Sequence, residues 1–422
     1  MKINTFRALG SRNYRLYFIG QTISLVGTWM QRTAVSWIIY NLTHSTFMLG
    51  LALFAGQFPS FMFSLFGGVV SDRYNRFRVL LATQIASMVQ ATLLALLVIF
   101  EQATVWEILS LSVVLGIINA FDVPARQSLV YEMVDNKEDL PNALALNSSM
   151  VNLARLVGPA ISGIVLEKFG ESVCFLTNSG SFLAVIVSLL FMRLPKYIPK
   201  ERKKKVLGEV KEGYYYLRST PSIGYVILML ALMSFLVLPF NTLLPVYAKQ
   251  IFRGSASTFG YINSFIGLGS VAGAIFLASL NPGADLKKIL LINTLIFGGG
   301  LILFSHETKF PLAMVFAVCT GFGMMSQTTI SNTIIQTQAA VHMRGRVISY
   351  FALAFFGMQP LGSLMIGSIS QYIGSPDTIL FEGITAILIA LLFMPFLRKD
   401  KLKQKDKSIV DKIGKQIAQT VR

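Results

Sequence analysis

Twelve apolar segments of about membrane length follow one another along this chain of 422 residues. A helix needs about 20 apolar residues to cross a bilayer. Only 14% of the residues are charged, whereas about a quarter are charged in a typical soluble protein. The sequence therefore predicts an all-α polytopic membrane protein with twelve transmembrane helices, near 16–40, 47–70, 79–100, 105–133, 142–166, 172–191, 223–248, 257–280, 288–305, 311–338, 346–371 and 377–397.

The longest polar interruption, residues 193–218, is basic and divides the apolar segments into two sets of six. We interpret it as a cytoplasmic linker between two pseudo-symmetric six-helix bundles, 16–192 and 219–397. An amphipathic lead-in, 1–15, precedes them and a basic tail, 398–422, follows. Transporters are often built from two similar halves, with the substrate site between them near the membrane midplane. The two sets of six segments therefore predict a substrate site in that place.

The net charge of +17 is spread very unevenly. If the N-terminus is cytoplasmic, 30 of the 37 Lys and Arg fall in inner segments. Such an excess is the positive-inside pattern, so both termini are expected to be cytoplasmic. The membrane is expected to be a bacterial inner or plasma membrane. The charge therefore predicts topology and no nucleic-acid partner. The two cysteines, Cys174 and Cys319, are expected to be small buried hydrophobes outside any disulfide.

A short charged turn follows the second apolar segment, with the sequence Gly68-Val-Val-Ser-Asp72-Arg73-Tyr-Asn75-Arg76-Phe-Arg78. Gly68 is expected to let the second helix approach a neighbour closely. Asn75 is expected where the chain reverses, because Asn tolerates left-handed dihedrals. The sequence predicts a gate cluster at the cytoplasmic surface, made by Gly68, Asp72, Arg73, Arg76, Arg78 and Glu132.

This turn resembles the signature loop of the major facilitator superfamily, roughly G-x-x-x-D-R-x-G-R-(R/K), with Asn75 in place of the usual glycine and Phe77 in place of the second base. Further segments resemble the branch that includes the enterobactin exporter and macrolide and drug efflux permeases. They are Phe6-Arg-Ala-Leu-x-Ser-Arg-Asn-Tyr-Arg15, Gly27-Thr-Trp-Met-Gln31-Arg32, Asn41-Leu-Thr-x-Ser45, Asp122-Val-Pro-Ala-Arg126-Gln127 and Arg344-Gly-Arg346-Val. The resemblance implies alternating access, export driven by a proton gradient, and a cavity lined by helices 1, 4, 7 and 10.

Charged residues inside apolar segments are functional candidates. Asp122 and Arg126 are four residues apart, so they share one helix face. They form either a structural ion pair or a proton-titrating acid with its partner, and Pro124 between them predicts a local helix break. Arg32 is either a buried or snorkelling arginine or a cavity contact for an anionic substrate. The predicted substrate and proton pathway contains Gln31, Arg32, Asn119, Asp122, Arg126, Arg155, Asn241 and Gln327.

We expect a proton-coupled efflux antiporter for a small amphiphilic compound, acting as a monomer in the lipid bilayer without a cofactor. An importer or a lipid transporter of the same fold is the main alternative. A channel suits paired halves less well. A membrane enzyme acting on lipids is disfavoured because the three histidines all lie in loops, and neither a metal-ligand cluster nor a catalytic nucleophile is apparent.

Overall fold

The computed structural model of the protein describes residues 6–194, 206–281 and 283–420, with side chains described except in 206–210 and 398–420. This part of the chain is built from helices joined by short turns. The first half contains η1 (Arg7–Gly10), α1 (Arg12–Thr43), α2 (Thr46–Arg73), α3 (Arg76–Ile99), α4 (Val105–Met133), η2 (Lys137–Asp139), α5 (Leu140–Phe169) and α6 (Glu171–Leu190).

The second half begins with α7 (Val206–Ser219), within the predicted linker. It continues with α8 (Pro221–Leu236), η3 (Leu238–Leu243), α9 (Leu244–Val246), η4 (Tyr247–Ile251), α10 (Ala256–Ala278), α11 (Leu286–Ser305), α12 (Phe310–Gln338), α13 (Arg344–Ala352), η5 (Leu353–Gly357), α14 (Met358–Ile373) and α15 (Ser375–Thr420). Residues 1–5 of the predicted lead-in and 195–205 of the linker lie outside the described residues.

Eleven helices in the described part are long and apolar enough to cross a membrane, so the predicted all-α polytopic fold is confirmed. The first helix, α1, is not among them, and its crossing stays a prediction. Its polar residues explain the difference. Gln21, Ser24 and Gln31 lower its hydropathy, yet all three are buried, because α1 packs against α2, α4, α5 and α6.

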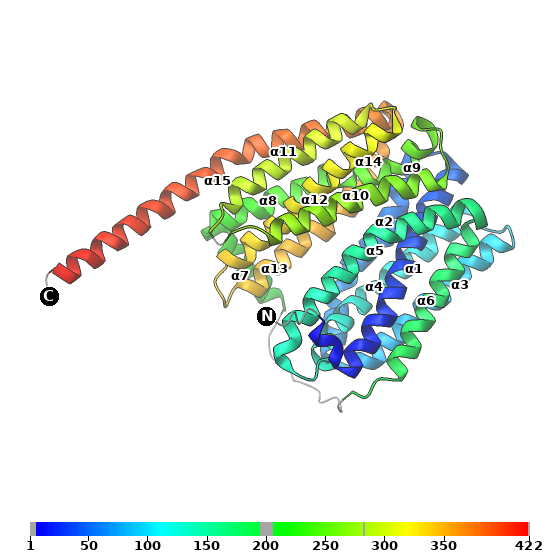
Figure 1. The fold of residues 1–422 in the computed structure, drawn as a ribbon, viewed down its shortest axis with the longest axis horizontal. Helices are drawn as coiled ribbons and strands as arrows, with labels where there is room; N and C mark the ends of the chain where they lie inside the picture. Colours follow the sequence, from blue (N-terminus) through cyan, green and yellow to red (C-terminus); the bar gives the residue numbers. More distant parts are fainter. Residues whose placement is uncertain (1–5, 195–205, 282, 421–422) are drawn as a thin grey trace.

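The helices form two groups, α1–α6 and α8–α15, which we call the first and second group (Figure 1). They contact each other mainly through α2 with α14 and α5 with α10. We call the end that holds the 72–78 turn, η1, η2 and α7 the basic end, and the opposite end the far end. Figure 1 shows the groups meeting near α2 and α9 at the far end and diverging toward the basic end.

Small residues make the contact between the groups close. A Cβ on Gly50 of α2 would lie 2.4 Å from the Ser363 carbonyl oxygen of α14. A Cβ on Gly163 of α5 would lie 2.8 Å from the Ala256 carbonyl oxygen at the start of α10. Membrane helices use small residues at such crossings because backbones can then touch.

Two local predictions about α2 and α4 were wrong. Gly67, and not Gly68, makes the close approach: a Cβ on Gly67 would lie 1.9 Å from the Ala120 carbonyl oxygen of α4, whereas nothing lies within 4 Å of one on Gly68. Pro124 does not break α4. It removes the N–H that would bond the Ala120 carbonyl, and Gly67 packs on that freed oxygen.

The other local corrections concern Asn75 and Cys319. Asn75 has φ −62° and does not adopt a left-handed conformation; its side-chain oxygen caps α3 by accepting from the N–H groups of Phe77 and Arg78. Cys174 is buried as predicted, but Cys319 is exposed on α12; both are free thiols.

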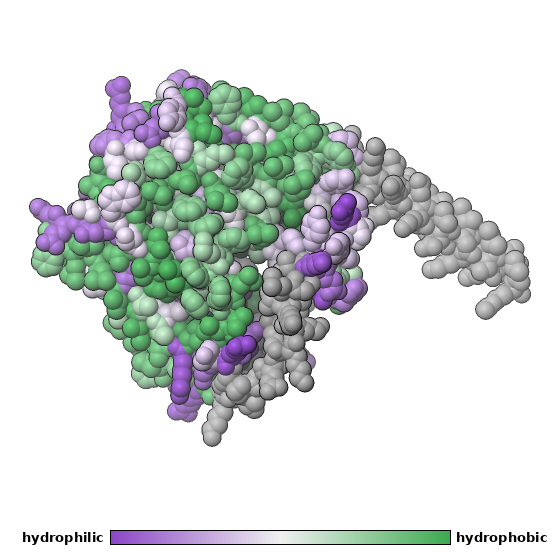
Figure 2. Space-filling view, turned by 180° about the vertical axis from the view of Figure 1, so that it is seen from behind, coloured by the Kyte–Doolittle hydropathy of each residue, from purple (hydrophilic) through white to green (hydrophobic). Residues whose placement is uncertain are grey.

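The outer surface is largely apolar. Figure 2 shows hydrophobic side chains over most of one face, with hydrophilic ones toward its rims. Large exposed residues include Ile19, Leu65, Leu183, Ile275 and Leu392. A soluble protein rarely exposes so much contiguous apolar surface, so this face is suited to contact with lipid.

Candidate functional site

Asp122 lies in the middle of a buried polar network within the first group. Its carboxylate forms an ion pair with Arg126 one helical turn away, as the spacing predicted. It also accepts hydrogen bonds from Thr83 Oγ1 at 3.0 Å and Gln84 Nε2 at 2.6 Å, both on α3. Asp122 keeps 4% of its side-chain exposure and Arg126 keeps 21%. The acid is therefore enclosed, and its arginine partner is partly exposed.

Helices α1 and α5 complete this network. The Tyr17 hydroxyl of α1 lies near the Asn147 side chain of α5 and interacts with the charges of both Arg126 and Asp122. Tyr17 is itself buried. Four helices therefore contribute to the surroundings of one carboxylate. A change in its charge would be felt by α1, α3, α4 and α5 at once, because electrostatic interactions are strong where water is excluded.

Arg32 and Arg155 both lie near Trp29, an aromatic residue that no local pattern in the sequence points to. The guanidinium carbon of Arg32 is 5.3 Å from the centre of the Trp29 ring, and that of Arg155 is 5.8 Å from it. Arg155 also reaches from α5 to Met325 of α12, where its Nη1 lies 3.8 Å from the sulfur. These side chains therefore meet where the two groups of helices face each other.

The four uncharged pathway candidates lie in different surroundings. Gln31 is buried within the first group, where its amide donates to Gln90 at 3.0 Å and accepts from Asn178 at 2.7 Å. Asn119 is half-buried on α4. Asn241 is half-buried in η3 and donates to the carbonyl of Leu238. Gln327 is fully buried in α12. Asn119 lies one helical turn from Asp122 on α4, but no hydrogen bond within the described residues joins any of the four to Asp122.

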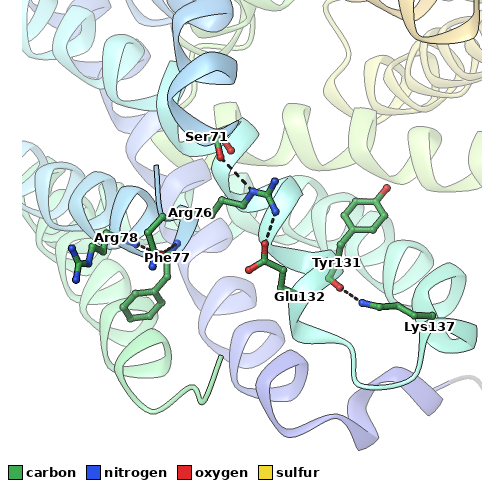
Figure 3. A network of polar contacts seen from close by, with 8 residues as sticks. Ser71, Arg76, Phe77, Arg78, Tyr131, Glu132 and Lys137 are labelled. Carbon is green, nitrogen blue, oxygen red and sulfur yellow. Dashed lines mark hydrogen bonds and ion pairs between the residues drawn. The ribbon is translucent and has the colours of Figure 1, made fainter. Parts of the chain in front are cut away.

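The gate cluster contains a defined ion pair. Arg76 at the start of α3 pairs with Glu132 at the end of α4, and its Nε donates to the Ser71 carbonyl at 3.3 Å (Figure 3). Asp72 is half-buried at the last turn of α2, while Arg73 and Arg78 are exposed. All these residues belong to the first group. The Arg76–Glu132 pair connects the 72–78 turn to α4. The gating role of the cluster stays a prediction.

Sequence reasoning missed the partners that come from other helices. Thr83, Gln84 and Trp29 look ordinary in apolar segments, and no local spacing links them to Asp122 or Arg155. One available signal was the Gly158-Pro159 pair of α5, because glycine in a membrane helix lets a neighbour approach closely. A Cβ on Gly158 would lie 2.5 Å from Trp29 Cβ, so this glycine makes room for the indole.

Comparison with known proteins identifies the family. Residues 3–421 match the sequence profile of the transmembrane secretion effector family. The chain belongs to this family of the major facilitator superfamily. The match covers almost the whole chain and confirms the resemblance inferred from the turn after α2.

Several relatives have assigned activities. The chain is 25% identical to the staphyloferrin A transporter of Staphylococcus aureus over 395 residues, covering 92% of this chain and 97% of the relative. It is 24% identical to an enterobactin exporter of Shigella boydii, covering 90% and 91%. It is 21% identical to macrolide efflux protein A of Streptococcus pyogenes, covering 90% and 96%.

Solved structures agree on the fold. A POT family transporter aligns with a TM-score of 0.72 at 15% identity, covering 92% of this chain and 96% of the other. A bacterial homologue of the lysosomal transporter Spinster also aligns with a TM-score of 0.72, at 13% identity, covering 92% and 97%. The family and these relatives are transporters and not enzymes, so the protein is a multi-span membrane transporter for small molecules.

Proposed function

We propose that this transporter exports a small amphiphilic compound by alternating access, coupled to proton entry. The observation that carries the proposal is the enclosed carboxylate of Asp122, bound by Arg126 and by two side chains of α3. When the acid takes up a proton, Arg126 loses its partner, and the balance between two arrangements of the helices changes. Three relatives named as a siderophore transporter, a siderophore exporter and a macrolide efflux protein support the substrate class.

The proposal includes a location and a topology. The protein acts as a monomer in the bacterial inner or plasma membrane, with twelve crossings, α1 among them, and both termini in the cytoplasm. The two bundles are 16–192 and 219–397. The basic end then faces the cytoplasm, where the excess of Lys and Arg belongs under the positive-inside rule. The substrate pathway runs between the two groups of helices, past Arg32 and Arg155.

Transport into everted membrane vesicles tests the proposal. Vesicles are acidified inside, and enterobactin, staphyloferrin A or a macrolide is added while a pH-sensitive dye reports the gradient. We expect substrate to accumulate in the vesicles while the gradient falls, and neither to occur in vesicles without the protein. Uptake only into right-side-out vesicles would instead assign import. Transport that leaves the gradient unchanged would remove the proton from the mechanism.

Asp72 provides a prediction about the gate. Asp72→Asn removes the only negative charge of the 72–78 turn while leaving the Arg76–Glu132 pair in place. We expect turnover to fall roughly tenfold, equivalent to about 1.4 kcal/mol in the limiting step, with substrate affinity unchanged. The measurements are initial transport rate and equilibrium binding. Glu101→Gln, which neutralises an exposed acid at the far end, is the control. Loss of binding in the Asp72 variant would contradict a gating role.

A further inference from the structure

Arg32 and Arg155 differ from Arg76 and Arg126 in having no carboxylate paired with them. Arg126 is paired with Asp122, and Arg76 is paired with Glu132. Within the described residues, no carboxylate forms an ion pair with Arg32 or Arg155. Each lies within 6 Å of the Trp29 ring, and the two cations repel one another. Charged side chains at membrane depth are normally paired, so this arrangement lacks an anion.

The position of this cluster fits a small-molecule site. Arg32 is exposed on α1, and Arg155 and Trp29 are half-buried. The sulfur of Met325, from the second group, lies 3.8 Å from Arg155 Nη1. Trp29 packs closely on Gly158 of α5, where a Cβ would lie 2.5 Å from Trp29 Cβ. The cluster thus combines two cations, one aromatic face and a polarisable thioether, at the place where the two groups meet.

We infer that Arg32, Trp29 and Arg155 bind an organic anion that carries an acidic group beside a flat apolar ring. This inference rests on the proposed export function and names the substrate class at the same pathway. Guanidinium groups bind carboxylates, sulfonates and phosphates through charge-assisted hydrogen bonds. The indole supplies a stacking surface for the ring, and the Met325 side chain adapts to its shape. The bound anion replaces the carboxylate that the two arginines lack.

The test compares two ligands that differ only in charge. The purified full-length protein is placed in phosphatidylcholine nanodiscs, and binding of 2-naphthoate and 2-naphthamide is measured by equilibrium dialysis. We expect naphthoate to bind at least tenfold more tightly than naphthamide. Arg32→Gln and Arg155→Gln should each weaken naphthoate binding about tenfold and leave naphthamide binding nearly unchanged. Arg32→Lys and Arg155→Lys, which keep the charge, should retain part of the selectivity.

Arg218→Gln is the matched control, because Arg218 is an exposed arginine of α7 at the basic end. It should leave both affinities unchanged. An anionic lipid headgroup is a second source of the same chemistry. Competition by dihexanoyl phosphatidylglycerol but not by dihexanoyl phosphatidylcholine would support the site with a lipid as its ligand. Absence of competition by either lipid would support a soluble anion.

Equal binding of naphthoate and naphthamide to the unaltered protein would overturn the inference, and this result requires no variant to fold. Unchanged naphthoate binding in both glutamine variants would also overturn it. Either result would leave the proposed export function intact, since that function is tested by vesicle transport. Conversely, anion-selective binding without transport in everted vesicles would support the site and count against export.

Discussion

Asp122→Asn is expected to yield a protein that inserts into the membrane but no longer moves protons when substrate is added. An amide cannot take up and release the proton that the carboxylate carries. The substitution keeps the shape of the side chain and its contacts with α3, where Thr83 and Gln84 donate to the acid. Substrate-induced proton movement should therefore fall to the level of vesicles that lack the protein.

A structural role for the Asp122–Arg126 pair predicts a loss of stability in the single variant that the double variant recovers. Removing one partner of a buried ion pair typically costs about 3–5 kcal/mol, because the other charge is left uncompensated. Arg126 retains 21% of its side-chain exposure, so we expect the lower part of that range. The double variant Asp122→Asn with Arg126→Gln removes both charges and should recover this stability.

The double variant therefore separates the two roles. If Asp122 carries the proton, both the single and the double variant fail to move protons, whatever their stability. If the pair only holds the helices together, the double variant regains coupling. Glu382→Gln is the matched control, because Glu382 is a fully buried acid of the second group, 1% exposed in α15. We expect it to keep proton movement. If Glu382→Gln lost proton movement while Asp122→Asn kept it, the proton-carrying acid would be Glu382 in the second group.

Hydropathy alone predicted the crossing helices, because the membrane requires every spanning segment to satisfy its own backbone. The ends of α2, α4 and α6 lie close to the predicted ends of their segments. The pairing of Asp122 with Arg126 was also predictable, since residues four apart on a helix are neighbours. These features depend on interactions that are local in sequence.

Features that depend on how helices are turned toward each other were not predictable. Gly67 and Gly68 are adjacent and identical, yet only Gly67 faces α4, because one residue turns the helix face by about 100°. The contact between Trp29 and Arg155 could not be predicted, because these residues are more than one hundred positions apart in the sequence. The hydropathy of α1 was lowered by the same polar residues that are buried among its neighbours. A single sequence does not encode these orientations in any local pattern.

Gly50→Leu is expected to keep the two groups of helices from closing at the far end. A Cβ at this position would lie 2.4 Å from the Ser363 carbonyl oxygen, and a Cβ on Gly367 would lie 2.5 Å from that of Thr46. The clashing atoms belong to the backbone, which cannot move aside as a flexible side chain can. The leucine side chain therefore forces α2 and α14 apart. Overpacking of this kind costs about 1–3 kcal/mol. If that free energy falls only on the closed arrangement, its population drops roughly 5- to 150-fold relative to the open one.

Cross-linking at the far end measures this change. Ser45 Oγ of the α2 cap donates to Gln371 Oε1 of α14 at 3.3 Å, so cysteines at these two positions report closure. They are placed in a chain in which Cys174 and Cys319 are replaced by alanine, and treated with a short bifunctional thiol reagent. We expect at least tenfold less cross-linking with Gly50→Leu. Gly56→Leu is the control on the same helix, because a Cβ there meets nothing within 4 Å.

Transport by the same variants connects closure to turnover. Alternating access requires the far end to close in each cycle, so Gly50→Leu should lose transport in proportion to its loss of cross-linking, while Gly56→Leu should keep both. Substrate binding should persist in Gly50→Leu, since Arg32, Trp29 and Arg155 lie on α1 and α5 and not on α2. Equal cross-linking in the two leucine variants would mean that α2 and α14 tolerate the added side chain without separating. Full transport without cross-linking would mean that closure between these helices is not part of the cycle.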